Sequence, residues 1–222
     1  MRMLTLSATL LACAAVCQPA QAELIPRGGG LIYDSSLNIT WLANALPGLG
    51  SWQDGADGQA WGDMSWELAL DFAAGYTLSD DVRGTLWSDW RLPKAQLDCA
   101  GYPCSQGELG HLFYEDFRAT PGWSWTSPFA PGIRLDQEAL FSNLQNAPYW
   151  TQDAVTPDPV HNLAWAFMSD GRQYANTRIS PSYVLLVRDG DVAAVPEPQP
   201  ALLLLAGLAS LALFKNRRRT QA

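Results

Sequence analysis

The sequence predicts an α+β domain with two helices, short antiparallel strands and long loops, with an apolar segment at each end of the chain. Two stretches repeat apolar residues with helical spacing, several short runs have strand composition, and Gly and Pro separate them. The chain has 222 residues. That length suits one ordinary domain plus processing segments. We therefore divide it into residues 1–22, 23–192 and 193–222.

Residues 1–22 have the order of a secretory signal peptide. Arg2 gives a short basic start, and Leu4 to Val16 is an apolar run. Ala20 and Ala22 then supply the small residues that signal peptidase requires. We predict cleavage after Ala22, so that the mature chain begins at Glu23 and the protein is exported.

Export changes the interpretation of the cysteines. Cys13 and Cys17 leave with the signal peptide, although a lipoprotein cut before one of them is a weaker alternative. Cys99 and Cys104 remain, and in an oxidising compartment this close pair predicts a local disulfide. So small a loop adds about 2 kcal/mol of stability. The pair offers too few ligands for zinc and lacks redox C-x-x-C spacing, so we predict no metal and no cofactor.

The body of the chain is strongly acidic. Between Glu23 and Val195 there are nine basic and 21 acidic residues, a net charge of −12. Nucleic-acid binding relies on basic residues that neutralise phosphates, so a nucleic-acid partner is not expected. All ten Trp lie between Trp41 and Trp165.

The first half of the body predicts a hairpin and a helix. Gly30–Asp34 and Asn38–Asn44 are β-prone runs joined by a polar turn, which indicates an opening hairpin. Ser65 can cap a following helix. Apolar residues of that helix recur at i, i+3, i+4 and i+7, namely Trp66, Ala69, Leu70 and Ala73.

A second helix is predicted near residue 108. Ser105 and Glu108 form a capping box. One apolar stripe follows, made of Leu109, Leu112, Phe113 and Phe117. His111 falls off that stripe, so we interpret it as exposed and inert, and we interpret the adjacent acids Glu115 and Asp116 as solvated.

The second half predicts short strands. Tyr149–Thr151, Leu163–Met168 and Tyr183–Asp189 have strand composition, and Pro and Gly break up the chain between them.

No catalytic residue is assigned, because no nucleophile elbow, phosphate loop or H-E-x-x-H sequence is present. Aromatic side chains offer a different chemistry, stacking on sugar rings or on another protein. The candidates are Trp123, Trp125, Tyr149 and Trp150. In a strand Trp123 and Trp125 would share a face. Burial in the core is the competing interpretation and the commoner outcome for Trp.

The C-terminal tail resembles a PEP-CTERM sorting signal. VPEP at Val195–Pro198 precedes an apolar stretch and the basic run KNRRR. The resemblance implies that an exosortase recognises Pro196, Glu197 and Pro198, and that a transmembrane helix at about residues 200–214 first holds the protein in the inner membrane. The apolar core, Ala201–Phe214, is about 21 Å long as a helix against about 30 Å of hydrocarbon, which suits a temporary tether. The basic end stays cytoplasmic.

The body also resembles a known family. SDWRLPK at Ser88–Lys94, ELGHLFYE at Glu108–Glu115 and AWAF at Ala164–Phe167 recur in order in the Lcl C-terminal domain family, whose function is unknown. The resemblance covers Leu24–Val192 and implies a C-type-lectin-like fold related to formylglycine-generating enzymes. The copper-site cysteines and the EPN or WND sugar motifs of those relatives are absent, so neither activity is carried over.

Together these features predict an exported, non-enzymatic protein that exosortase sorts to the cell surface or exopolysaccharide matrix of a Gram-negative bacterium. A structural or adhesive role there, with a polysaccharide or cell-surface ligand, is the leading interpretation. Two alternatives stay open: a secreted enzyme acting on extracellular polysaccharide, and a periplasmic protein permanently anchored in the inner membrane.

Overall fold

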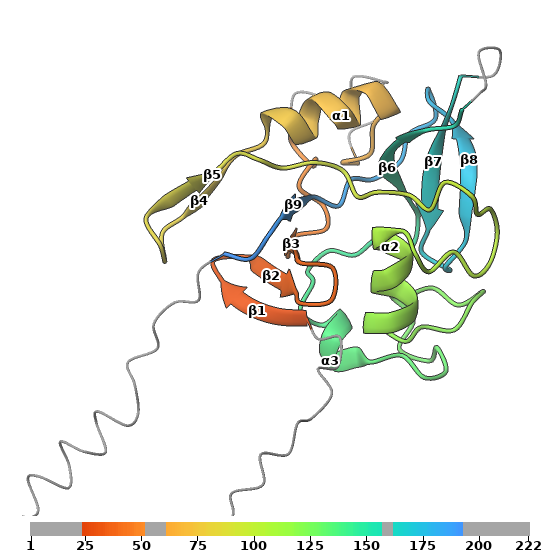
Figure 1. Cartoon of the computed structure of the whole chain (residues 1–222), viewed down its shortest axis with the longest axis horizontal. Helices are drawn as coiled ribbons and strands as arrows, with labels where there is room; N and C mark the ends of the chain where they lie inside the picture. Colours follow the sequence, from red (N-terminus) through yellow and green to blue (C-terminus); the bar gives the residue numbers. More distant parts are fainter. Residues whose placement is uncertain (1–23, 52–60, 157–161, 193–222) are drawn as a thin grey trace, which may run out of the picture.

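The computed structural model describes residues 24–51, 61–156 and 162–192 (Figure 1). The described strands are β1 Leu24–Gly28, β2 Leu31–Asp34, β3 Ile39–Leu42, β4 Leu78–Asp80, β5 Thr85–Trp87, β6 Pro148–Ala154, β7 Leu163–Met168, β8 Gln173–Thr177 and β9 Val187–Asp189. The described helices are α1 Trp66–Gly75, α2 Glu108–His111, the π-helix η1 Leu112–Asp116, and α3 Leu135–Glu138.

The described strands form three antiparallel sheets. Sheet A has the order β1-β2-β3-β9, β4 and β5 form a two-stranded ribbon, and sheet E has the order β6-β7-β8. The predicted opening hairpin is confirmed as β2 and β3, with Leu31 opposite Leu42. The predicted strand Leu163–Met168 is confirmed as β7. Of the run predicted at Tyr183–Asp189, only Val187–Asp189 is a strand, β9, which pairs with β3.

The predicted fold class is wrong. The regular structure of the described chain is mostly β-strands in three small sheets, and α1 with ten residues is its only helix longer than five. The α+β class expected from two helices, and the C-type-lectin-like fold implied by the family resemblance, are therefore not what forms. The second predicted helix is one α-turn followed by a π-turn. The predicted signal peptide and the predicted transmembrane segment at 200–214 lie outside the described residues. Within the described ranges no helix is long and apolar enough to span a membrane.

Helix α1 forms where its periodicity predicts. Ser65 occupies the N-cap position, although its side chain makes no capping hydrogen bond. The helix buries Trp66, Ala69, Phe72 and Ala73. The indole of Trp66 donates a hydrogen bond to the carbonyl of Thr151 at 2.8 Å, so α1 is held against β6.

The core consists of two hydrophobic clusters on either side of residues 183–187. Leu185 and Val187 belong to the cluster that packs against α2 and η1. Val184 and Leu186 belong to the cluster that packs against α1. Side chains alternate sides along an extended chain, so an uninterrupted apolar run is needed where both sides are covered.

Arg91 joins three distant parts of the chain. Its guanidinium donates to both carboxylate oxygens of Glu108, at 2.7 and 2.8 Å, and to Asp189. The backbone of Arg91 also pairs with Val187, the first residue of β9. Glu108 accepts a further hydrogen bond from the backbone N–H of Lys94, at 2.8 Å. The predicted capping box is therefore wrong: α2 has Gly107 at its N-cap, and Glu108 binds Arg91 instead.

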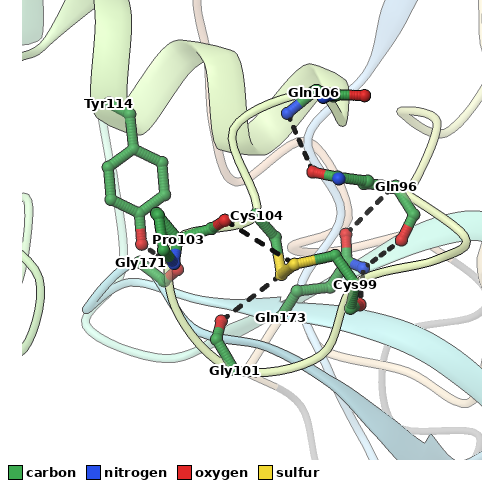
Figure 2. The surroundings of a disulfide bond; sticks show 9 residues. All are labelled: Gln96, Cys99, Gly101, Pro103, Cys104, Gln106, Tyr114, Gly171 and Gln173. Atoms are coloured by element: carbon green, nitrogen blue, oxygen red, sulfur yellow. Dashed lines mark hydrogen bonds between the residues drawn. A yellow bond between two sulfur atoms is a disulfide. The ribbon is translucent and has the colours of Figure 1, made fainter.

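The predicted disulfide between Cys99 and Cys104 is confirmed, with the two Cα atoms 5.7 Å apart. Figure 2 shows how its loop is held on sheet E. The side-chain amide of Gln173 in β8 donates to the carbonyls of Gln96 and Cys99, at 2.6 and 2.7 Å. Gly101 and Gln173 also exchange backbone hydrogen bonds. The disulfide loop is therefore hydrogen-bonded to the edge strand of sheet E.

Candidate functional site

Three of the four aromatic residues predicted to stack on a ligand belong to the core. Trp125, Tyr149 and Trp150 are fully buried, so the stacking prediction is wrong for them. Tyr149 and Trp150 are successive residues of β6 and point into opposite clusters, both of which are covered. Their polar atoms are used internally, since the Trp150 indole donates to the carbonyl of Met64 and the Tyr149 hydroxyl accepts from the N–H of Gln145.

Trp123 is the one candidate at the surface, with 46 % of its area exposed. It lies in a turn, not on a strand with Trp125. The adjacent Gly122 donates its N–H to the carbonyl of Asp170, in the turn between β7 and β8. Tyr102, 44 % exposed, donates its hydroxyl to the Asp170 carboxylate at 2.6 Å. We call Tyr102, Trp123 and Asp170 the Asp170 surface.

A second group of residues forms a polar cluster that sequence reasoning missed. Asp34, His111 and Asp116 each bring one potential ligand atom within 4.8 Å of the others. Asp34 is the last residue of β2, His111 ends α2, and Asp116 ends η1. The cluster therefore joins sheet A to the α2–η1 segment.

The π-turn places His111 and Asp116 together. The N–H of Phe117 bonds to the carbonyl of Leu112, five residues earlier. Residues five apart in an α-helix point about 140° away from each other. A π-turn closes i to i+5 hydrogen bonds and brings such residues one above the other. His111 Nε2 and Asp116 Oδ2 are 3.8 Å apart as a result.

Asp34 is held by the turn that follows β2. Its Oδ1 accepts hydrogen bonds from the backbone N–H groups of Ser36 and Leu37, at 3.0 and 3.1 Å, and from the Ser36 hydroxyl. Ser36 Oγ lies 2.7 Å from His111 Nε2. Because the single hydroxyl proton of Ser36 is directed to Asp34, Ser36 Oγ accepts from the imidazole. The other oxygen of Asp34, Oδ2, is buried and has no hydrogen-bond partner among the described residues.

Asp116 is the most unusual member of the cluster. It is fully buried, and neither carboxylate oxygen accepts a hydrogen bond from any residue that the structure describes. Burial raises the pKa of Asp116 to about 8, and the charge of Asp34 adds to this rise while that of Arg134 opposes it. The interpretation of Asp116 as a solvated acid is therefore wrong. That of His111 as exposed and inert is wrong too, because only 17 % of its side chain is exposed and it contacts Ser36.

The arrangement suits ion binding better than nucleophilic catalysis. In a serine–histidine–aspartate triad the carboxylate binds the ring nitrogen opposite the serine. Here Ser36 and Asp116 approach the same nitrogen, Nε2, and the Ser36 proton is engaged by Asp34. Two carboxylates and one imidazole instead form a partial set of metal ligands.

The remaining predicted site residues lie outside the described residues. These are Ala20, Ala22 and Glu23 at the signal-peptide cleavage site, and Pro196, Glu197 and Pro198 in the sorting signal. In comparisons with known proteins, no family model, no curated protein and no solved structure matches the chain.

Proposed function

We propose that this chain is an exported, non-catalytic protein that an exosortase delivers to the cell surface or exopolysaccharide matrix, where it has a structural or adhesive role. The order of its sequence carries the proposal: a leader at residues 1–22, a disulfide-bearing acidic body, and VPEP followed by an apolar stretch and KNRRR. The resemblance of this tail to a PEP-CTERM signal supplies the exosortase as processing partner.

The disulfide supports the export part of the proposal. Disulfides persist in oxidising compartments and are rare where thiols are kept reduced. Cys99 and Cys104 are bonded, and the loop between them is integrated into the edge of sheet E (Figure 2).

The Asp170 surface supports the adhesive part. Exposed aromatic rings beside a carboxylate are suited to sugars, because the rings stack on the apolar face of a sugar and the carboxylate accepts from its hydroxyls. Trp123 has about half of its area exposed, and Tyr102 is fixed in place by its hydrogen bond to Asp170.

Fractionation of the producing bacterium tests the sorting. The full-length protein is followed in cells with and without the exosortase, and a Glu197→Ala variant is followed in parallel. We expect the wild-type protein at the surface or in the matrix, and accumulation in the inner membrane when either the enzyme or Glu197 is removed. An inner-membrane location in all three cases would reject sorting and favour a permanent anchor.

Binding to the producer's own polysaccharide tests the adhesive role. Trp123→Ala should weaken binding by about tenfold, in line with about 1–3 kcal/mol for an aromatic stacking contact. Trp61→Ala is the matched control, since Trp61 is 64 % exposed but lies in the loop before α1. Equal binding by both variants would remove the Asp170 surface from the proposal, and no binding by the wild-type protein would remove adhesion altogether.

A further inference from the structure

We propose that Asp34, His111 and Asp116 bind a divalent first-row transition-metal ion, with Zn²⁺ as the probe. This site is independent of the proposed surface role.

The ligand atoms lie near enough to one another to be drawn onto one ion. Zinc binds imidazole nitrogen and carboxylate oxygen at about 2.0–2.2 Å in tetrahedral geometry, so two ligand atoms of one ion are about 3.4 Å apart. The atoms of the cluster lie within 4.8 Å of one another, and His111 Nε2 and Asp116 Oδ2 are 3.8 Å apart. Binding therefore requires the longest pair to close by up to about 1.4 Å, and the His111–Asp116 pair by about 0.4 Å.

The unpartnered carboxylates independently point to a ligand. Asp116 is fully buried, and neither of its carboxylate oxygens accepts a hydrogen bond from a described residue. Asp34 is buried too, and its Oδ2 has no hydrogen-bond partner among the described residues. Buried charged groups are normally paired, hydrogen-bonded or bound to a metal, because leaving them alone costs several kcal/mol. A divalent cation between them would neutralise both carboxylates.

A proton is the simpler alternative occupant. Burial raises the pKa of Asp116 to about 8. One proton would cancel only one of the two negative charges, whereas a divalent ion cancels both and adds a bond to the imidazole. A carboxylate that binds a metal is deprotonated. His111 must also give up its hydrogen bond to Ser36 and carry its remaining proton on Nδ1.

The ligand types select the class of ion. Imidazole suits zinc and its transition-metal neighbours, whereas calcium takes six to eight oxygen ligands. The cluster offers two carboxylates and one imidazole.

The cluster is accessible to solvent ions on the side of Ser36 and His111. Ser36 is exposed and the His111 side chain is 17 % exposed. Three protein ligands leave a position for water, as in open zinc sites.

Calorimetric titration of the purified full-length chain, stripped with EDTA, tests the proposal. We expect one Zn²⁺ to bind saturably with these three ligands, together with a rise in melting temperature. Asp116→Asn and His111→Gln should each weaken this binding by at least about 100-fold. Glu115→Gln is the matched control: it removes a negative charge from the exposed neighbour of Asp116 and should change the affinity by less than about threefold.

Folding of each variant is checked by circular dichroism, and His111→Gln decides the question if Asp116→Asn does not fold. Without metal, Asp116→Asn should melt at or above the wild-type temperature, because it removes a buried carboxylate that has no described hydrogen-bond partner. Absence of saturable Zn²⁺ binding, or wild-type affinity in both ligand variants, overturns the site. Saturable binding of Ca²⁺ but not Zn²⁺ overturns the assigned class of ion.

Discussion

Replacing Arg91 with methionine should be among the most destabilising single changes at a polar position. The change removes two hydrogen bonds from Arg91 to Glu108 and two to Asp189, and leaves Glu108 with the N–H of Lys94. Removing one partner of a buried ion pair costs about 3–5 kcal/mol. The side chains of Arg91 and Glu108 keep 20 % and 10 % exposure, which places the cost at about 3 kcal/mol.

Urea and thermal denaturation measure this cost. For a chain of this size about 3 kcal/mol corresponds to a fall of about 6–12 °C in melting temperature. Asp189→Asn is the matched control, because it removes the other partner of Arg91 at a side chain that is 73 % exposed, and it should cost less than about 1 kcal/mol. The reasoning is refuted if Asp189→Asn costs as much as Arg91→Met, or if Arg91→Met costs less than about 1 kcal/mol.

Three further predictions concern the fold. Breaking the disulfide by Cys99→Ser should cost about 2 kcal/mol in unfolding free energy, since the loop closed is short. Gly110→Ala should cost more than about 3 kcal/mol in the same measurement, because its Cβ would lie 1.8 Å from the backbone carbonyl of Cys104, whereas Gly75→Ala meets nothing within 4 Å and should be neutral. For buried Asp80, burial alone would raise the pKa, but hydrogen bonds from a neighbouring indole and guanidinium outweigh it and hold the pKa below the ordinary 3.8. Ionised Asp80 therefore stabilises the folded state above pH 3.8, and this stabilisation is lost as the pH falls below that value. The Asp80→Asn variant should have a lower free energy of unfolding than the wild-type protein at pH 7, and the two values should converge in acid.

Local patterns predicted the elements that depend on local forces. The hairpin of β2 and β3 has runs of strand-forming residues on both sides of a polar turn. Helix α1 has apolar residues at helical spacing along its whole buried face. Contacts between residues far apart in the sequence leave no such pattern in the sequence. Arg91 binds Glu108, Asp189 and the backbone of β9, and the only sign of this in the sequence is an arginine between two apolar residues in WRLP.

The candidate metal site escaped prediction for a geometric reason. Helical periodicity assigns faces with 3.6 residues per turn, and by that rule His111 and Asp116 point apart. The π-turn that begins at Leu112 has more residues per turn than an α-helix. His111 and Asp116, five residues apart, therefore lie on the same side of the segment and face Asp34. The burial of Tyr149 and Trp150 has a simpler cause: two clusters cover both sides of β6, and residue type alone does not reveal how many sides of a strand are covered.

The candidate metal site lies where the α2–η1 segment meets sheet A. The first and last described strands, β1 and β9, both belong to this sheet (Figure 1). The Asp170 surface lies on the β7–β8 turn of sheet E. Between them stands the α2–η1 segment, where Tyr114 donates to the carbonyl of Gly171 at 2.7 Å while His111 and Asp116 face Asp34 of sheet A. An ion bound there would join sheet A to the segment that supports the Asp170 turn. The proposed metal is therefore a structural link between two parts of the fold, a role that requires no catalytic chemistry.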